Sequence, residues 1–221
     1  DVYLEGSSEH FMGILPKMVT GSVPNDGGNL ILAKDEVVEL LDSHSKAEKF
    51  IFEYCGAQDY IAGKRRYCLY IRDFELNEAE GIPPVAERLR AVQALRRESK
   101  KKETREVLSQ HPNRFQHDAG KPNSHLVIVP RVTTENRDYL PVGLLGSKTI
   151  ISDQAFGIFD CPIWNIAILS SRIHLIWIAT VCGRLKTDFR YSNALGWGNF
   201  PIAPLTEKNK SDLTRSAENI L

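Results

Sequence analysis

The sequence predicts an α+β fold in which a mixed sheet accompanies one long basic helix. Strand-like and helix-like segments follow one another irregularly, without the repeated β-α-β order that indicates a parallel sheet. The 221 residues are 42% hydrophobic and 25% charged, as in ordinary globular proteins. This length suffices for one large domain or two small ones.

Hydrophobic periodicity and turn signals place the first elements. Residues 1–33 are rich in glycine and proline and read as a linker-like lead-in, followed by a helix over residues 35–54 with Asp35 as its N-cap. Residues 65–73 alternate like a half-buried strand. The longest helix is expected over residues 84–109, where apolar residues recur at helical spacing.

The second half of the chain predicts further strands and one apolar helix. Strands are expected at residues 125–130, 140–145, 149–152, 155–159 and 163–169. A helix over residues 170–182 follows, capped by Ser170 or Ser171. Its inward-facing residues are expected to be Ile173, Trp177 and Val181. Polar residues interrupt the apolar run of residues 163–182, so this run predicts a core segment and not a membrane span.

Charge and cysteine content restrict the class of protein. Basic and acidic residues both number 28, so the formal net charge is zero and only local clusters of charge could bind a polyanion. His111 and His117 lack neighbouring ligands for a metal site. The first six residues lack the features of a signal peptide. Reduced, mostly buried thiols, typical of a cytoplasmic protein, are expected at Cys55, Cys68, Cys161 and Cys182.

Residues 183–193 carry the most distinctive charge pattern. Lys186, Asp188 and Arg190 occupy alternate positions, so an extended backbone would present all three on one side. In the DNA major groove, guanine offers acceptors suited to Lys or Arg, and cytosine offers a donor suited to Asp. The pattern therefore fits a reader of base-pair edges. The residues alone leave open a surface ion pair, worth well under ~1 kcal/mol.

The long helix predicts a second contact with nucleic acid. Arg90, Arg97, Lys101 and Arg105 are separated by seven, four and four residues. At about 100° per residue they would share less than a quarter of the helix circumference and could contact phosphates without reading sequence. Further cations widen this surface: Arg88, Arg96, Lys100 and Lys102. The alternative is a solvated helix face with intrahelical ion pairs.

Catalytic motifs are missing from the printed sequence. It contains no glycine-rich nucleotide loop, no nucleophile elbow and no His-Glu-x-x-His zinc motif. The Asn/Asp-Pro-Pro-aromatic tetrapeptide of amino-methyltransferases is also missing, and the Glu-x-Lys at residues 98–100 lacks the Pro-Asp of a nuclease site. We therefore expect a non-catalytic piece of a longer polypeptide, which the missing initiating Met also suggests.

Short motifs along most of the chain form one ordered set, at residues 16–19, 21–22, 24–32, 63–69, 88–89, 130–132, 169–171 and 181–192. In this order they resemble the MmeI-like restriction–modification proteins, single chains that combine an endonuclease, an adenine methyltransferase and a target recognition domain. Residues 199–201 and 204–205 are similar to the segment that closes many such recognition domains. Each motif is weak by itself, and the ordered set is specific.

The resemblance implies a role for particular residues. Residues 1–205 would form a DNA target recognition domain, and residues 206–221 would begin a helical spacer. In this family the pair at positions 186 and 188 varies with the recognised base, so Lys186 is expected to read guanine and Asp188 its paired cytosine. Arg190 would read a neighbouring pair, together with Gln154 or Asp153.

The resemblance also places the catalytic parts upstream of this sequence. The whole protein would be an adenine-N6 DNA methyltransferase using S-adenosylmethionine, with Mg²⁺ if a nuclease is present, while this piece would hold no cofactor. Its partners would be double-stranded DNA and the methyltransferase domain of the same chain, in the bacterial cytoplasm and without a membrane. The alternative is a non-catalytic scaffold or specificity subunit whose basic helix contacts another protein.

Overall fold

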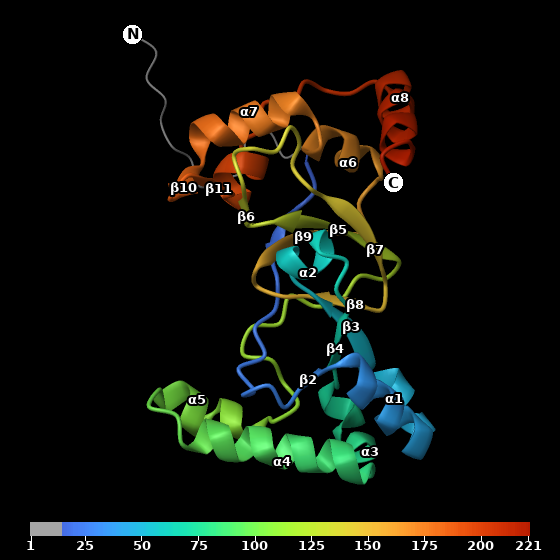
Figure 1. Cartoon of the computed structure of the whole chain (residues 1–221), viewed down its shortest axis with the longest axis vertical. Helices are drawn as coiled ribbons and strands as arrows, with labels where there is room; N and C mark the ends of the chain where they lie inside the picture. Colours follow the sequence, from blue (N-terminus) through green and yellow to red (C-terminus); the bar gives the residue numbers. More distant parts are fainter. Residues whose placement is uncertain (1–14) are drawn as a thin grey trace. The chain divides into compact units, whose positions relative to one another are not determined.

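The computed structural model describes residues 15–221, so the expectations about residues 1–14 lie outside the described residues. The chain forms two compact units. Within the described residues, unit 1 comprises residues 15–20, Lys121–Ser147 and Gln154–Leu221, and unit 2 comprises Gly21–Gly120 and Lys148–Asp153. Each unit contains strands from more than one part of the sequence, as the colours of Figure 1 make visible.

Unit 2 is built on a four-stranded mixed sheet with the order β2-β4-β3-β8. Its strands are β2 (Ile31–Leu32), β3 (Ile51–Cys55), β4 (Arg66–Leu69) and β8 (Thr149–Ile151). β8 returns from a distant part of the sequence and pairs parallel to β3, whereas the other pairs are antiparallel. This sheet, together with the helices around it, confirms the predicted α+β class with a mixed sheet.

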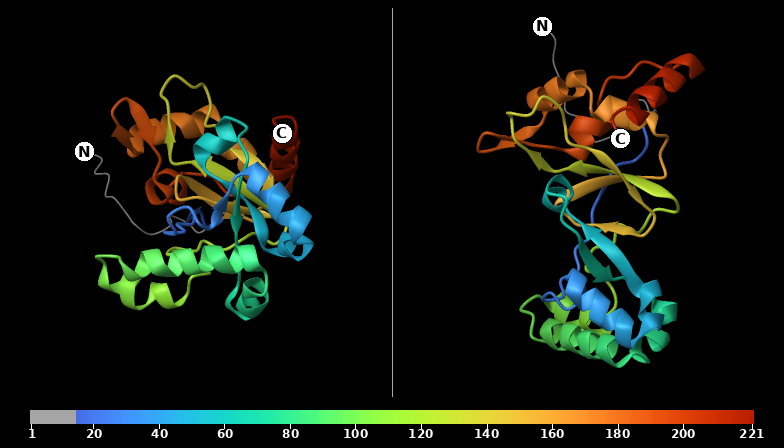
Figure 2. Two further views of the ribbon diagram at one scale, coloured as in Figure 1. Left: turned by 60° about the horizontal axis from the view of Figure 1, so that its bottom comes forward. Right: turned by 45° about the vertical axis from the view of Figure 1, so that its right-hand side comes forward.

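Five helices belong to unit 2. They are α1 (Lys34–Ser43), α2 (Ala57–Ile61), α3 (Leu76–Glu80), α4 (Pro83–Arg97) and α5 (Lys102–Glu106), with short 3-10 turns at Ser45–Phe50, Asp73–Glu75 and Leu108–Gln110. Of these helices, α1, α3 and α4 contribute side chains to the core of the unit. Buried side chains of α4, among them Val85, Leu89 and Val92, lie in one core cluster with Phe50 and Leu69. Figure 2 shows α4 in green as the longest rod of this unit.

The helix expected over residues 35–54 is wrong in its extent. α1 ends at Ser43, and the aromatic and β-branched residues that follow form β3 instead. Asp35 is not the N-cap, because that position belongs to Ala33, whose backbone N–H donates to Glu36 Oε2 at 2.7 Å. The glutamate reaching back from the first turn therefore supplies the missing acceptor.

The long helix expected over residues 84–109 is broken in two. α4 ends at Arg97, and α5 begins only at Lys102. Between them the Ser99 hydroxyl accepts a hydrogen bond from the backbone N–H of Lys101 at 3.2 Å. A serine that bonds its own neighbouring backbone competes with helix formation, which accounts for the interruption.

Unit 1 contains two antiparallel sheets. The larger has the order β1-β9-β5-β7, from β1 (Val19–Thr20), β5 (His125–Pro130), β7 (Gly143–Gly146) and β9 (Ala155–Phe159). The smaller has the order β10-β11-β6, from β6 (Val132–Thr133), β10 (Gly183–Leu185) and β11 (Asp188–Arg190). β5 and β6 are adjacent in sequence, so the backbone turning at Arg131 leads from one sheet to the other.

The helices of unit 1 are α6 (Trp164–Leu169), α7 (Arg172–Val181) and α8 (Glu207–Glu218), with a π-helical turn at Asn193–Gly198. The strand expected at residues 163–169 is wrong, because this run forms α6. A short apolar run that is buried on all sides has no periodicity to separate a strand from a helix. α7 is confirmed, and Ser171 caps it by accepting from the His174 backbone N–H at 3.1 Å.

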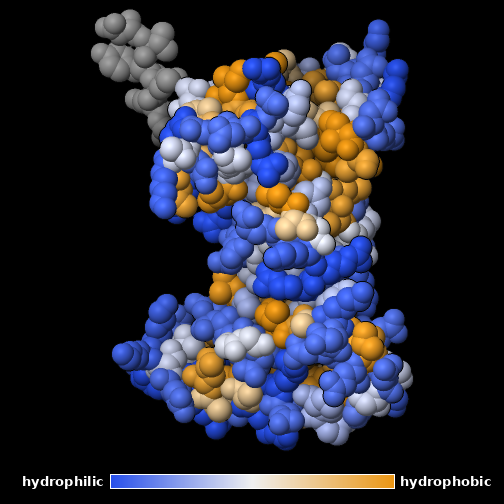
Figure 3. Space-filling model, viewed as in Figure 1, coloured by the Kyte–Doolittle hydropathy of each residue, from blue (hydrophilic) through white to orange (hydrophobic). Residues whose placement is uncertain are grey.

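The expected orientation of α7 is wrong for Ile173 and confirmed for Trp177, which is partly buried against the core. Ile173 is 73% exposed, and His174, Leu175 and Ile178 are the buried residues of this helix. Figure 3 shows hydrophobic residues at the surface over α7, at the top of the view.

None of the helices in residues 15–221 combines the length and the apolar character needed to cross a membrane.

Candidate nucleic-acid interface

Strands β10 and β11 form a hairpin joined by the two residues Lys186 and Thr187 (Figure 1). The register pairs Gly183 with Arg190, Arg184 with Phe189, and Leu185 with Asp188. Residues directly opposite each other in an antiparallel pair have their side chains on the same face, and successive residues alternate between faces. The hairpin therefore has an inner face with Arg184 and Phe189, and an outward face with Gly183, Leu185, Asp188 and Arg190.

The inner face fixes the hairpin to unit 1. Phe189 is 7% exposed and packs into the core beneath α7. The Arg184 guanidinium lies 4.8 Å from the centroid of the Phe189 ring and donates to Glu135 Oε2 at 2.7 Å and to the Thr187 carbonyl at 2.9 Å. Arg184 thus connects the turn of the hairpin to the β6–β7 loop, and its role was not recognised from the sequence.

The outward face carries two of the three predicted base-reading charges. Asp188 and Arg190 lie two residues apart on β11 and share this face, as expected. Lys186 does not belong to the same extended segment, because it occupies the turn with a φ of 58°. The expectation that all three alternate along one strand is therefore wrong for Lys186, which instead projects from the tip.

The three predicted base-reading side chains have no partner within residues 15–221. No hydrogen bond or ion pair joins the side chains of Lys186, Asp188 or Arg190 to another residue among those described. In particular, Lys186 and Asp188 do not form the surface ion pair that was the alternative interpretation. Lys186 and Arg190 are exposed and Asp188 is half-buried, so all three remain accessible to a ligand.

Asp153 and Gln154 form the turn between β8 and β9, and both are exposed. The backbone N–H of Asp153 donates to the Ser22 carbonyl at 3.1 Å, and the Gln154 carbonyl accepts from the Arg131 N–H at 3.3 Å. Asp153 belongs to unit 2, whereas Gln154 belongs to unit 1 with the hairpin. Their base-reading role stays a prediction.

The four predicted phosphate contacts do not lie on one helix. Arg90 and Arg97 are exposed on α4, seven residues apart and therefore on the same face. Lys101 precedes α5, and Arg105 lies within it, where its guanidinium donates to the Ser99 carbonyl at 3.0 Å. The cations remain close in sequence around the α4–α5 connection, but the single stripe is wrong because the helix is interrupted.

Arg96 does not widen the basic surface as expected, because it is completely buried. Its guanidinium donates five hydrogen bonds of 2.8–3.3 Å, all to backbone carbonyls: those of Pro24, Asn25, Leu108, His111 and Arg114. Burial lowers the pKa of Arg96 to about 10, so it is still a cation at neutral pH. Arg96 follows Val92 by four residues on the buried face of α4, which the interpretation as a surface cation overlooked, and it holds together two loops of unit 2.

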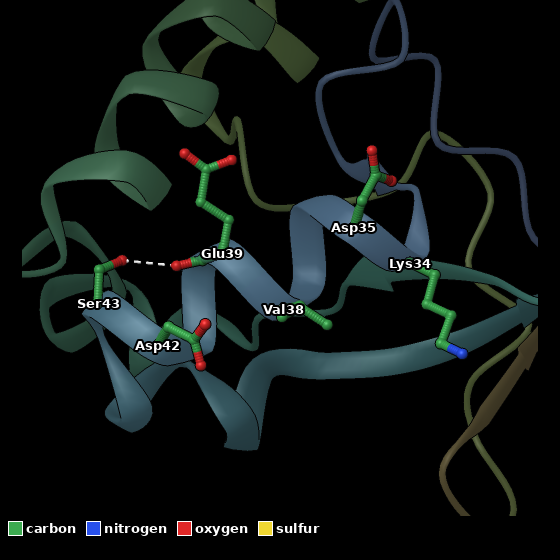
Figure 4. A pocket seen from close by; sticks show the side chains of 6 residues that line it. All are labelled: Lys34, Asp35, Val38, Glu39, Asp42 and Ser43. Carbon is green, nitrogen blue, oxygen red and sulfur yellow. Dashed lines mark hydrogen bonds between the residues drawn. The ribbon is translucent and has the colours of Figure 1, made fainter.

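A different surface of unit 2 has the opposite charge. The outer face of α1 has a shallow hollow of about 890 Å³, lined by Asp35, Glu39 and Asp42 around Val38 (Figure 4). These carboxylates outnumber the one ammonium group there, that of Lys34. A surface of this charge repels phosphate and does not suit DNA.

The remaining polar groups singled out in the sequence are structural. His174 is buried, with Nε2 2.9 Å from the Tyr191 hydroxyl, and desolvation lowers its pKa to about 4. Cys55, Cys68 and Cys161 are buried free thiols, and burial raises the pKa of each. Within residues 15–221, no group of three or more His, Cys, Asp or Glu side chains is arranged to hold a metal ion.

Comparisons with known proteins agree on one family. The family described as MmeI, target recognition domain, matches residues 1–204. DNA methyltransferase A of Bacillus subtilis (strain 168) is 34% identical over 207 residues, which are 94% of this chain and 23% of that protein. The Type IIL restriction-modification enzyme MmeI, solved in complex with DNA, is 28% identical with a TM-score of 0.85, over 93% of this chain and 27% of that one. The chain thus spans about a quarter of the length of these relatives, and it belongs to the MmeI target recognition domain family.

Proposed function

We propose that this chain reads the DNA sequence for a restriction–modification methyltransferase. The observation that carries the proposal is the outward face of the β10–β11 hairpin, where Asp188 and Arg190 have no protein partner among the described residues. The major groove of B-DNA, about 12 Å wide, admits a two-stranded β-ribbon. A hairpin fixed by Arg184 on its inner face can therefore present its outer face to base edges.

The conformation of Lys186 supports a role for its side chain. A φ of 58° is unfavourable for L-residues with a long side chain, and Gly, Asn or Asp is the usual choice there. Local strain of this kind is retained where the surrounding structure or the function requires it. A cation at the tip of the hairpin suits the O6 and N7 acceptors of guanine.

The base assignments follow the charges. Lys186 reads guanine, and Asp188 accepts from N4 of the paired cytosine. Arg190, together with Gln154 or Asp153, reads a neighbouring base pair. Each good contact of this kind discriminates against the wrong base pair by about 1–3 kcal/mol.

Sequence-independent affinity comes from cations outside the hairpin. Arg90, Arg97, Lys101 and Arg105 are exposed at and near the α4–α5 connection. Contacts of such residues with phosphate release counterions, so binding weakens as salt increases. The role of these residues is to hold the duplex while the hairpin discriminates between sequences.

The methyl-transfer step belongs to a part of the whole protein other than this chain. There the target adenine is flipped out of the duplex and methylated at N6, with S-adenosylmethionine as methyl donor. DNA cleavage, if the whole protein has it, uses Mg²⁺ in a further domain. The setting we propose for this reaction is the bacterial cytoplasm, with the recognition and methyltransferase domains in one polypeptide.

The decisive experiment exchanges charges in the full-length protein. Lys186→Glu combined with Asp188→Arg should change one recognised pair from G·C to C·G, as read by sequencing methylated plasmid DNA. The control is Lys34→Glu with Asp35→Arg, which makes the same exchange at exposed positions of α1 and should leave the recognised sequence unchanged. An unaltered recognition sequence in a folded, active Lys186/Asp188 variant would rule out base reading by this pair.

A protein-binding scaffold is the second candidate, favoured by the exposed Ile173 and Ile176 of α7 and by the acidic face of α1. Titrating the binding of duplex DNA against salt separates the two functions. DNA recognition predicts a steep loss of affinity with salt, and a shallower slope after charge reversal of Arg97, Lys101 and Arg105. Binding without a salt slope, or no binding by the full-length protein, would favour the scaffold.

A further inference from the structure

The outward face of the hairpin carries two uncharged residues beside the proposed base-reading charges. Leu185 is 52% exposed and lies directly opposite Asp188. Gly183 is exposed and lies directly opposite Arg190. We propose that both residues help to determine specificity: Leu185 contacts the C5 edge of a pyrimidine, and Gly183 leaves room for a base edge beside Arg190. This inference rests on the proposed function, because it assumes that this face meets the major groove.

The position of Leu185 matches the chemistry of a pyrimidine edge. Side chains directly opposite each other across an antiparallel pair have Cβ atoms about 4.5–5.5 Å apart. The exocyclic group at C4, which Asp188 reads in cytosine, and the substituent at C5 are neighbours on the same major-groove edge. An apolar side chain next to Asp188 is therefore placed to contact C5, and apolar contact with a C5 methyl group is a recognised mode of readout.

The protein itself does not need the Leu185 side chain in this place. An exposed leucine contributes little to the core, and Leu185 is absent from the buried cluster that includes its neighbour Phe189. It also stands between Arg184 and Lys186, at the end of a hairpin with charged residues on both faces. A contact with an apolar group of a ligand would remove this side chain from water.

Gly183 is not required by the fold either. Its φ does not lie in the left-handed region, and an added Cβ would meet no atom within 4 Å. Glycine weakens a strand, so its presence in β10 needs a reason. A glycine is useful in a strand where another molecule approaches the backbone closely. The space opposite Arg190, which a larger side chain would fill, is where a base edge would lie.

The test of Leu185 uses C5 methylation as the probe. Once the recognition sequence of the full-length protein is known, duplexes are made with uracil for thymine, or 5-methylcytosine for cytosine, at each pyrimidine in turn. At one pyrimidine, removal or addition of the methyl group should change the affinity of the unmodified protein about fourfold, the factor that one buried methyl group is worth. In Leu185→Ala this response should disappear, whereas it should persist in Val38→Ala, which has the same 52% exposure on α1.

The test of Gly183 separates folding from recognition. Gly183→Ala should keep or raise thermal stability, because glycine weakens a strand and the added Cβ meets no atom, whereas Gly183→Leu should weaken specific DNA binding at least tenfold. Gly146→Ala and Gly146→Leu are matched controls, because an added Cβ at Gly146 also meets open space. Unimpaired specific binding by Gly183→Leu would overturn the role of this glycine.

The outcomes distinguish this inference from the proposed function. If the charge exchange at Lys186 and Asp188 alters the recognised pair while Leu185→Ala keeps the full methyl response, the hairpin reads bases but Leu185 does not. If the charge exchange alters nothing, the proposed function of the hairpin fails as well. A methyl response that is equal in the unmodified protein and in Leu185→Ala at every pyrimidine overturns the role of Leu185.

Discussion

Two arginines in the two units use their hydrogen-bond donors in opposite ways. In unit 2, Arg96 at the end of α4 donates to five backbone carbonyls and is completely buried. In unit 1, Arg190 on β11 is exposed, and its guanidinium donates to no other described residue. A cation whose donors are all satisfied by the protein acts in folding, whereas a cation without protein partners is available for binding. The charge pattern of the sequence alone does not distinguish the two roles.

The largest expected effect is on the stability of unit 2. Arg96→Met removes the guanidinium and leaves five carbonyls without that donor, so the free energy of unfolding should fall by about 3–5 kcal/mol, measured by chemical denaturation. Arg97→Met is the matched control one residue later, and its exposed side chain should change stability by less than about 0.5 kcal/mol. Equal effects of the two substitutions would contradict the contrast between buried and exposed cations.

The same contrast explains what could be predicted from the sequence. Asp188 and Arg190 share a face because alternation with period 2 is a local property of a strand. The hydrogen-bond partners of Arg96 could not be predicted, because these carbonyls come from residues 24–25 and 108–114 and meet only in the folded unit. Its burial could have been read from the spacing, because Arg96 follows Val92 by four residues and Leu89 by seven and so shares their buried face of α4.

Two parts of unit 1 were predicted wrongly because the sequence carries no local signal for them. The run at residues 163–169 is buried on nearly all sides, so its sequence fits a strand as well as it fits α6. Lys186 was assigned to an extended segment because nothing in its side chain indicates a left-handed turn. The charge exchange tests base reading by Lys186 and Asp188, and the base-reading roles of Arg190, Gln154 and Asp153 stay predictions.

His174, a buried histidine of unit 1, should make stability depend on pH. Desolvation lowers the pKa of His174 to about 4, below the value of about 6.5 expected in the unfolded chain. The unfolded state therefore binds the proton first as pH falls, and the free energy of unfolding should decrease between about pH 6.5 and 4, by up to about 3 kcal/mol. Above pH 6.5 this contribution to stability is complete.

Replacement of His174 tests this dependence. In His174→Phe the difference in unfolding free energy between pH 7 and pH 4 should be smaller than in the unmodified protein, as measured by urea denaturation at each pH. His44→Gln, at a half-buried histidine of unit 2, should keep the full difference. If His174→Phe retains the same dependence on pH, another group is responsible for it.

The smallest expected effect is at the tip of the hairpin, where binding and stability should oppose each other. Lys186→Gly relieves the left-handed backbone and should stabilise the protein by about 1 kcal/mol, while Lys186→Ala removes the same cation without relieving it. Both variants should lose discrimination at one base pair, and only the glycine variant should gain stability in thermal denaturation. Equal stability of the two would mean that the turn carries no strain, and the conformation of Lys186 would then say nothing about its function. A gain of stability together with a loss of discrimination would mark this turn, unlike the loops around Arg96, as a place where the fold gives up stability for recognition.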